Sequence, residues 1–243
     1  MAEAAKENGV FLMEAFMYRC HPQTTKLVEL IRDGAIGDVG VIQATFSFHA
    51  GFHAHGRLFS NALGGGGILD VGCYTTSIAR LVAGAALGLP FANPIKVSGF
   101  ARLHPEVGTD SYAIASAQFP GGILAQLATG VSLSQENGLR VYGSKGSIHV
   151  PHPYAISLEG GESTILLKRG EATETIVTKT DSWLYALEAN AVADALAQGR
   201  LESHAMPVAD SLGNMAALDA WRSSAGFVYE SEKPNLGKDS VPR

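Results

Sequence analysis

The sequence of 243 residues predicts an α+β fold, in which a large, mostly antiparallel open sheet carries helices on one face. One observation is that strand patterns dominate a continuous part of the chain, residues 95–180. Another is that Pro120-Gly121-Gly122 joins two of these strands in a tight turn, which makes the pair antiparallel. Helical patterns lie before and after this region, so the helices can cover one side of the sheet.

Two short elements are predicted at the start of the chain. Residues 2–8 predict a helix, and the pair Asn8-Gly9 is a helix-stop signal that ends it. Residues 10–16 form a short apolar run of the kind found in buried strands.

A longer helix and a strand follow. The helix is predicted over residues 22–33, because Pro22 suits its first turn, apolar side chains gather on one face and Gly34 ends it. Apolar and polar residues then alternate over Ile42–Phe48, which predicts a strand.

The glycine run Gly64–Gly67 introduces the next helix, which is predicted to reach about Ala83 and to end at Gly84. The main strands come next, and Ser144-Lys145-Gly146 is a predicted turn between two of them. Strands are expected over residues 95–102, 111–119, 123–133, 139–142, 147–150, 165–168 and 175–178, and final helices near residues 183–198 and 208–228.

The composition indicates a globular protein with one sizeable core, since 46% of the residues are hydrophobic and 17% are charged. A net charge of -5 argues against nucleic acid or an anionic membrane as a partner. The sequence contains no run of 18 uncharged apolar residues, so we expect no transmembrane span. Two cysteines are too few for a disulfide framework, and reduced thiols favour a cytoplasmic location.

The most informative motif follows the glycine run. Asp70 and Tyr74 are four residues apart in the predicted helix, so their side chains are expected on one face, one turn apart. A phenol can give or take the proton of a substrate hydroxyl, and a carboxylate beside it can orient that hydroxyl. The alternative is an ordinary solvated or hydrogen-bonded helix face.

Three segments, taken together and in this order, resemble one family of dinucleotide-dependent oxidoreductases. They are Val10–Pro22, Leu30–Val39 and the segment Gly64–Tyr74. The family, Gfo/Idh/MocA, includes glucose–fructose oxidoreductase and inositol dehydrogenase. The tyrosine that ends the Asp-x-Gly-x-Tyr motif resembles the branch with xylose dehydrogenase and dihydrodiol dehydrogenase. The resemblance runs from about residue 3 to about residue 233.

The resemblance implies a division of the chain. Residues 1–17 are expected to be a remnant, the last helix and strand, of a Rossmann nucleotide-binding domain, and residues 18–243 the substrate-binding and oligomerisation domain. The Gly-x-Gly-x-x-Gly turn of such a domain is absent from the sequence. The family also has a Glu-Lys-Pro tripeptide, with an active-site lysine, just before the first matched segment. Glu232-Lys233-Pro234 lies at the other end and is interpreted as a polar tail.

The implied activity is hydride transfer between NADP or NAD and a hydroxyl-bearing carbon of a sugar or vicinal diol. Tyr74 would exchange the hydroxyl proton, and Asp70 would hold the substrate. An ammonium group would normally lower the pKa of such a phenol. Since the lysine is not in this sequence, the chain alone is expected to be inactive and to bind neither cofactor well. The family further implies a homodimer, or a tetramer of dimers, through the open face of the sheet.

Three residues are candidates for contact with the cofactor. Arg57 precedes Asp70 by thirteen residues, a spacing at which related reductases place an arginine near the cofactor. Arg19 follows the strand predicted over residues 10–16, and Trp183 matches a position where relatives often have tyrosine. The alternatives are a surface arginine for Arg57, an ion pair at the domain junction for Arg19 and a core aromatic for Trp183.

Three histidines, His49, His53 and His55, fall within seven residues, and three histidines can form a zinc site. No acidic residue stands near them at a helical spacing. We therefore expect no metal site, and interpret the segment as pocket lining or a plain loop.

Three hypotheses on function stay open. The chain is a truncated form of an ordinary dehydrogenase, a stand-alone sugar- or partner-binding module without redox activity, or an NAD-using glycosidase of the same fold. Asp70, Tyr74 and Arg57 together favour the first. The substrate is expected to depend on the loops around residues 49–63 and 104–109.

Overall fold

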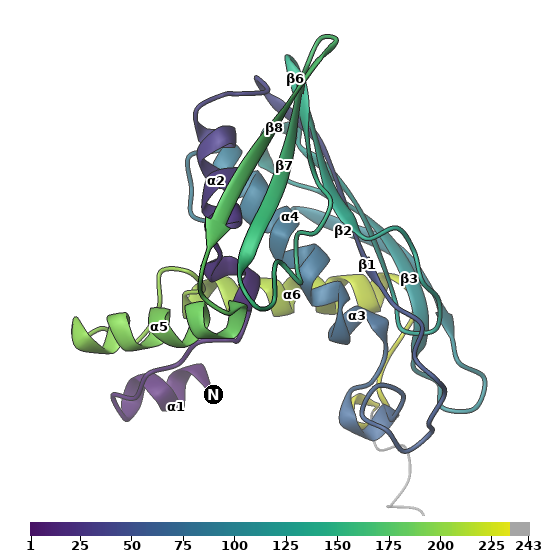
Figure 1. Ribbon diagram of the computed structural model, residues 1–243. Coiled ribbons are helices and arrows are strands. Elements are labelled where there is room, and N and C mark those ends of the chain that lie inside the picture. The colour runs from purple at the N-terminus through teal and green to yellow at the C-terminus, as the bar shows by residue number, and fades with distance from the viewer. Residues whose placement is uncertain (234–243) are drawn as a thin grey trace, which may run out of the picture.

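The computed structural model describes residues 1–233, so Pro234 and the rest of the expected polar tail lie outside the described residues. Eight strands form one sheet in the order β2-β3-β4-β1-β5-β6-β7-β8. Only the pair β1–β4 is parallel among the strand pairs of these residues, which confirms the predicted open, mostly antiparallel sheet (Figure 1). The strands are β1 (Val39–Ser47), β2 (Lys96–Leu103), β3 (Asp110–Gln118), β4 (Leu124–Gly130), β5 (Gly138–Gly143), β6 (Gly146–Val150), β7 (Gly161–Arg169) and β8 (Ala172–Thr180).

The helices gather on one side of this sheet, where α4 packs on β1 and β4 and α6 packs on β2 (Figure 1). They are α1 (Ala2–Glu7), α2 (Pro22–Arg32), α3 (Gly67–Asp70), α4 (Gly72–Ala86), α5 (Leu184–Ala197) and α6 (Val208–Ser224). Within residues 1–233, no helix is long and apolar enough to cross a membrane.

The core lies between the sheet and the helices. Along β3, Ala113, Ala115 and Ala117 are buried, and their small side chains leave room for the helices that cover this face. The alternating residues point the other way, onto an open face where Ile114 and its neighbour Phe100 of β2 are exposed. The sheet therefore has one covered face and one open face, as the sequence predicts.

The strand predicted over residues 10–16 does not form. The segment is extended, but a strand needs a neighbour in hydrogen-bonding register. Its backbone contact with a distant part of the chain is the bond from Leu12 N to Leu201 O, 3.0 Å long, in an irregular segment. The apolar pattern correctly predicted burial at its end, since Phe16 is buried.

The helix predicted from Gly67 to Ala83 is instead two helices. Val71 has φ -126° and ψ -15°, outside helical values, and separates α3 from α4. Nor does Gly84 end the second helix, which continues to Ala86. A side chain at Gly84 would place its Cβ 2.3 Å from the Cα of Phe91, so this glycine permits a close backbone contact within the helix.

Candidate functional site

Asp70 is the last residue of α3, and its side chain is engaged by Arg57. The Arg57 Nη2 atom donates to Asp70 Oδ1 over 2.6 Å. The Arg57 side chain is 67% exposed and that of Asp70 is 12% exposed, so the arginine covers the acid from the solvent side. The structure thus brings together two of the site residues predicted from the sequence.

Tyr74 lies in the first turn of α4, just beyond the break at Val71. The expected arrangement of Asp70 and Tyr74 on one continuous helix is therefore wrong. The phenol donates to the sulfur of Met17 over 3.7 Å, and no hydrogen bond joins it to Asp70 among the interactions of residues 1–233. The two groups are still close enough that the charge of Asp70 contributes to the raised pKa of Tyr74.

Aromatic rings surround Tyr74. Its ring centroid lies 5.0 Å from that of Phe16, 5.4 Å from that of Phe46 and 5.9 Å from that of Tyr154. Phe46 and Tyr154 stack on each other at 4.6 Å and 8°. The alternation along β1 was the only signal for Phe46. Tyr154 lies in the irregular segment between β6 and β7, so no periodicity of the sequence pointed to it.

This surrounding raises the pKa of Tyr74 well above its usual value. Burial is the main cause, followed by the negative charges that Cys73, Tyr185, Tyr18 and Asp70 can carry. The largest contributions to the shift all raise the pKa, and none of them comes from a cation. The phenol is therefore neutral at physiological pH and carries the proton that it donates to the Met17 sulfur.

The glycine run and the residue after it, Ile68, are held by three side chains that the sequence did not single out. Tyr229 donates its hydroxyl to the oxygen of Gly65 over 2.7 Å, and Thr129 donates to the oxygen of Gly67 over 3.0 Å. The carboxylate of Asp110 accepts from the backbone N–H of Ile68 over 2.7 Å. These contacts come from distant parts of the chain, so the local pattern carried no signal for them.

Arg19 is buried in a polar cluster inside the domain. Its guanidinium donates to Asp210 Oδ2 over 2.6 Å, to the oxygen of Ala205 over 3.1 Å and to Ser77 Oγ over 3.3 Å. Asp210 also pairs with the fully buried Arg80. The structure therefore shows Arg19 in an ion pair, which was the alternative to cofactor contact.

The other candidates lie near the surface. Trp183 precedes α5, is 54% exposed and packs edge-on against Tyr185, so it is not the core aromatic of the alternative interpretation. His53 and His55 are exposed, while His49 forms an isolated bridge with Ser132. Across the described part of the chain, no group of three or more His, Cys, Asp or Glu side chains is arranged to hold a metal ion.

The two loops that were expected to determine the substrate meet in the structure. Phe52 and His104 stack with ring centroids 4.1 Å apart and planes at 10°. Thr109 donates to the backbone oxygen of Phe59 over 3.2 Å. The first loop also carries Arg57, so the loop that contacts residues 104–109 also forms the ion pair with Asp70.

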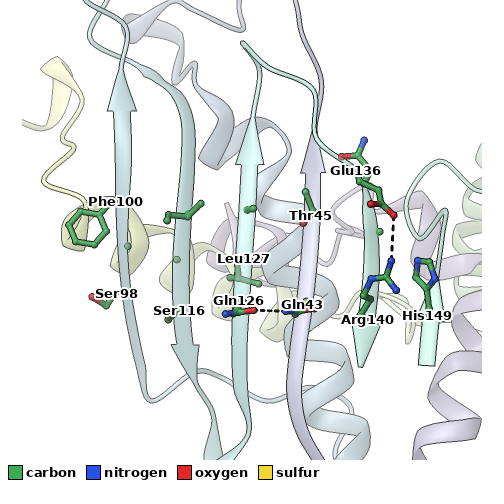
Figure 2. A pocket seen from close by; sticks show the side chains of 16 residues that line it. Gln43, Thr45, Ser98, Phe100, Ser116, Gln126, Leu127, Glu136, Arg140 and His149 are labelled. Atoms are coloured by element: carbon green, nitrogen blue, oxygen red, sulfur yellow. Dashed lines mark hydrogen bonds and ion pairs between the residues drawn. The ribbon is translucent and has the colours of Figure 1, made fainter. Parts of the chain in front are cut away.

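A separate groove of about 600 Å³ lies on the open face of the sheet. Figure 2 shows its polar centre, where Gln43 and Gln126 are hydrogen-bonded over 2.6 Å and Arg140 pairs with Glu136 over 3.4 Å. Tyr142 donates to Gln43 over 3.1 Å. Asp70 and Tyr74 do not line this groove, so it is distinct from the candidate site.

Comparison with known proteins agrees with the architecture. Residues 24–149 match the model of the GFO/IDH/MocA C-terminal domain. The trans-1,2-dihydrobenzene-1,2-diol dehydrogenase of Mus musculus is 29% identical over 237 residues, which cover 96% of this chain and 67% of that enzyme. An uncharacterized oxidoreductase of Rhizobium meliloti is 27% identical, over 93% of this chain and 65% of its own length. The chain thus spans about two thirds of the length of these relatives.

Two solved structures share the fold. The 3-ketoreductase KijD10 of Actinomadura kijaniata, in complex with NADP and TDP-benzene, superimposes with a TM-score of 0.78 at 23% identity, over 92% of this chain and 65% of that one. The aldose-aldose oxidoreductase of Caulobacter crescentus, complexed with glycerol, gives a TM-score of 0.79 at 21% identity, over 93% and 64% of the two chains.

Proposed function

Since the chain belongs to the GFO/IDH/MocA family, we propose that residues 18–243 are the substrate-binding and oligomerisation domain of a nicotinamide-dependent oxidoreductase that acts on a sugar or a vicinal diol. The observation that carries this proposal is the placement of the Tyr74 phenol beside Asp70 and its partner Arg57. Residues 1–17 would then be the remnant of a nucleotide-binding domain.

The proposed chemistry assigns one task to each residue. A bound nicotinamide cofactor supplies hydride transfer at the carbon that carries the hydroxyl. Tyr74 gives the proton to that oxygen in reduction, or takes it in oxidation once a cation has lowered its pKa. Asp70 accepts a hydrogen bond from a substrate hydroxyl and so fixes the direction of the reacting carbon.

Arg57 and Trp183 would contact the cofactor. The Arg57 side chain is 67% exposed beside Asp70, and a guanidinium is a good partner for phosphate or carboxamide oxygens. Trp183 is 54% exposed just before α5, so its ring is accessible to a ligand. The sequence-based proposal for Arg19 has less support, since three acceptors already occupy its guanidinium. We expect NADP or NAD as the cofactor.

The open sheet face supports a homodimer, or a tetramer of dimers. Phe100, Ile114 and Leu124 are 76%, 58% and 49% exposed on this face, and apolar patches of this kind mark interaction sites. Both cysteines are free, which supports the proposed cytoplasmic location.

The function can be tested by joining this chain to a family-type nucleotide-binding domain and assaying sugars and diols with both cofactors. Tyr74→Phe is expected to lower turnover by roughly 10²-fold or more with cofactor affinity nearly unchanged, because a positioned acid–base group is lost. Tyr142→Phe is a matched control, since its hydroxyl lies on the open face and bonds Gln43.

Full turnover by Tyr74→Phe on a confirmed substrate would overturn the acid–base assignment. The 243-residue chain alone is expected to bind neither NADH nor NADPH with micromolar affinity, because the phosphate-binding helix start of the family has no counterpart in its sequence. A fluorescence titration measures this directly.

A further inference from the structure

One buried carboxylate lies behind the candidate site and takes no part in the chemistry proposed above. Asp110, the first residue of β3, is fully buried. Its Oδ2 atom accepts from Ile68 N, and its Oδ1 atom has no hydrogen-bond partner among residues 1–233. A carboxylate in such a position is costly to bury, so its presence calls for an explanation.

The carboxylate occupies the space that a side chain of the glycine run would fill. Gly66 has φ +114°, and a Cβ there would lie 2.1 Å from Asp110 Oδ1. Gly66 and Ile68 bracket the start of α3, whose last residue is Asp70. Asp110 therefore contacts the beginning of the same four-residue helix that ends at the proposed substrate-binding acid.

Two titratable side chains interact electrostatically with Asp110, Arg222 and Tyr229. α6 presents Arg222, which is bound by Asp219 and Glu232 over 2.6–2.9 Å. Tyr229 follows α6 in the chain, and the charge of Asp110 contributes to raising its pKa. Burial raises the pKa of Asp110 to about 7, although the backbone N–H groups of Ile68 and Gly67 and the charge of Arg222 act in the opposite direction.

We propose that Asp110 is a positioning residue, whose carboxylate holds the N–H of Ile68 and the start of α3 and thereby fixes where Asp70 points. The inference rests on the proposed function only in treating Asp70 as the residue that holds the substrate. An ionised carboxylate accepts a charge-assisted hydrogen bond from Ile68, and protonation weakens that bond. Because α3 is a single turn between two breaks, a change at its start reaches Asp70 within three residues.

The test is a pH titration of the isotopically labelled 243-residue chain by NMR. The chemical shifts of the backbone amides of Ile68 and Asp70 are expected to change together between pH 5 and 9. Both should follow the titration of a single group, the Asp110 carboxyl, with a midpoint near 7. An Ile68 amide with the same chemical shift at every pH in the wild type and in Asp110→Asn would overturn the proposal, because the carboxylate would then not hold this N–H. So would an Ile68 titration that Asp70 does not follow, because the carboxylate would then hold the helix start without positioning the acid.

Two variants separate positioning from simple structural support. Asp110→Asn should abolish the titration of both amides. Thr129→Val removes another hydrogen bond to the run, at Gly67 O, and should keep the midpoint near 7 even if the chain melts at a lower temperature. An unchanged titration in Asp110→Asn would refute the assignment. The wild-type titration needs no variant, cofactor or substrate, so its result is independent of the turnover of Tyr74→Phe.

Discussion

At the scale of single residues, the ion pair between Arg57 and Asp70 is the most informative contact of the site. The Arg57 side chain is largely in solvent, so water screens its attraction to Asp70. The pair therefore contributes at most about 1 kcal/mol to the stability of the fold. Stability alone therefore gives little reason for the pair. Its position beside the loops fits the contact with ligands that we propose for it.

Substitutions in this pair should change binding more than folding. In the protein joined to a nucleotide-binding domain, Asp70→Asn is expected to raise KM, with a smaller loss of kcat, because an amide holds a hydroxyl less firmly. Arg57→Ala should weaken cofactor binding. Steady-state kinetics and thermal melts measure both effects, and a lowered Tm with unchanged activity per folded molecule would indicate a structural role instead.

Among the candidate site residues, the sequence led to a pair that is in contact but did not predict the local helix geometry. Asp70 and Tyr74 were chosen from residue type and spacing and Arg57 from the resemblance to related reductases, and Arg57 and Asp70 are in direct contact. The spacing rule for Asp70 and Tyr74 assumed a continuous helix, and the dihedral angles of Val71 break it. Asp110 could not be found, because its contact with Ile68 spans 42 residues and depends on how β3 meets α3.

At the scale of elements, the path of α4 through Gly84 links the helix to the segment that follows it. The backbone of Phe91 lies where the side chain of an ordinary residue would be. Glycine is normally unfavourable in a helix, by about 1 kcal/mol relative to alanine. Its position here is explained by the close contact and not by a helix stop.

Gly84→Ala is therefore expected to destabilise the protein, although alanine is the better helix former. A Cβ 2.3 Å from Phe91 Cα forces the backbone apart, and overpacking of this kind typically costs about 1–3 kcal/mol. Gly40→Ala is the control, because its nearest new contact is an ordinary 3.8 Å to the oxygen of Tyr142. Urea unfolding compares the two, and a neutral or stabilising Gly84→Ala would contradict the packing argument.

The strands and helices were predictable to different degrees for physical reasons. Alternation and the turn at Pro120–Gly122 were sufficient for β3 and β4, since each strand has one buried face. The apolar run over residues 10–16 gave no information on whether a neighbouring strand exists. The final helix was predicted to reach residue 228 but ends at Ser224, because periodicity locates a helix more reliably than its end.

At the scale of the whole molecule, the strand order decides which residues lie on the open face of the sheet. The strand order was not predictable, because the parallel pairing of β1 with β4 joins segments about 80 residues apart, which no local pattern records. The pairing of β4 with β3 determines which of its side chains face the open side of the sheet. Leu124 is 49% exposed on the open face, whereas Leu127 is buried toward the helices.

A stable dimer through this face should depend on Leu124. An obligate interface of this kind buries about 2,000 Å² or more in total, and a charge placed in it loses its hydration without gaining a partner. Leu124→Asp is therefore expected to yield monomers at micromolar concentration, as measured by light scattering, with the fold retained because the residue contributes little to the core. Leu89→Asp is a matched control, since Leu89 is 48% exposed and follows α4 away from the open face. A wild-type monomer, or dissociation by Leu89→Asp while Leu124→Asp stays dimeric, would show that the open face is not the interface.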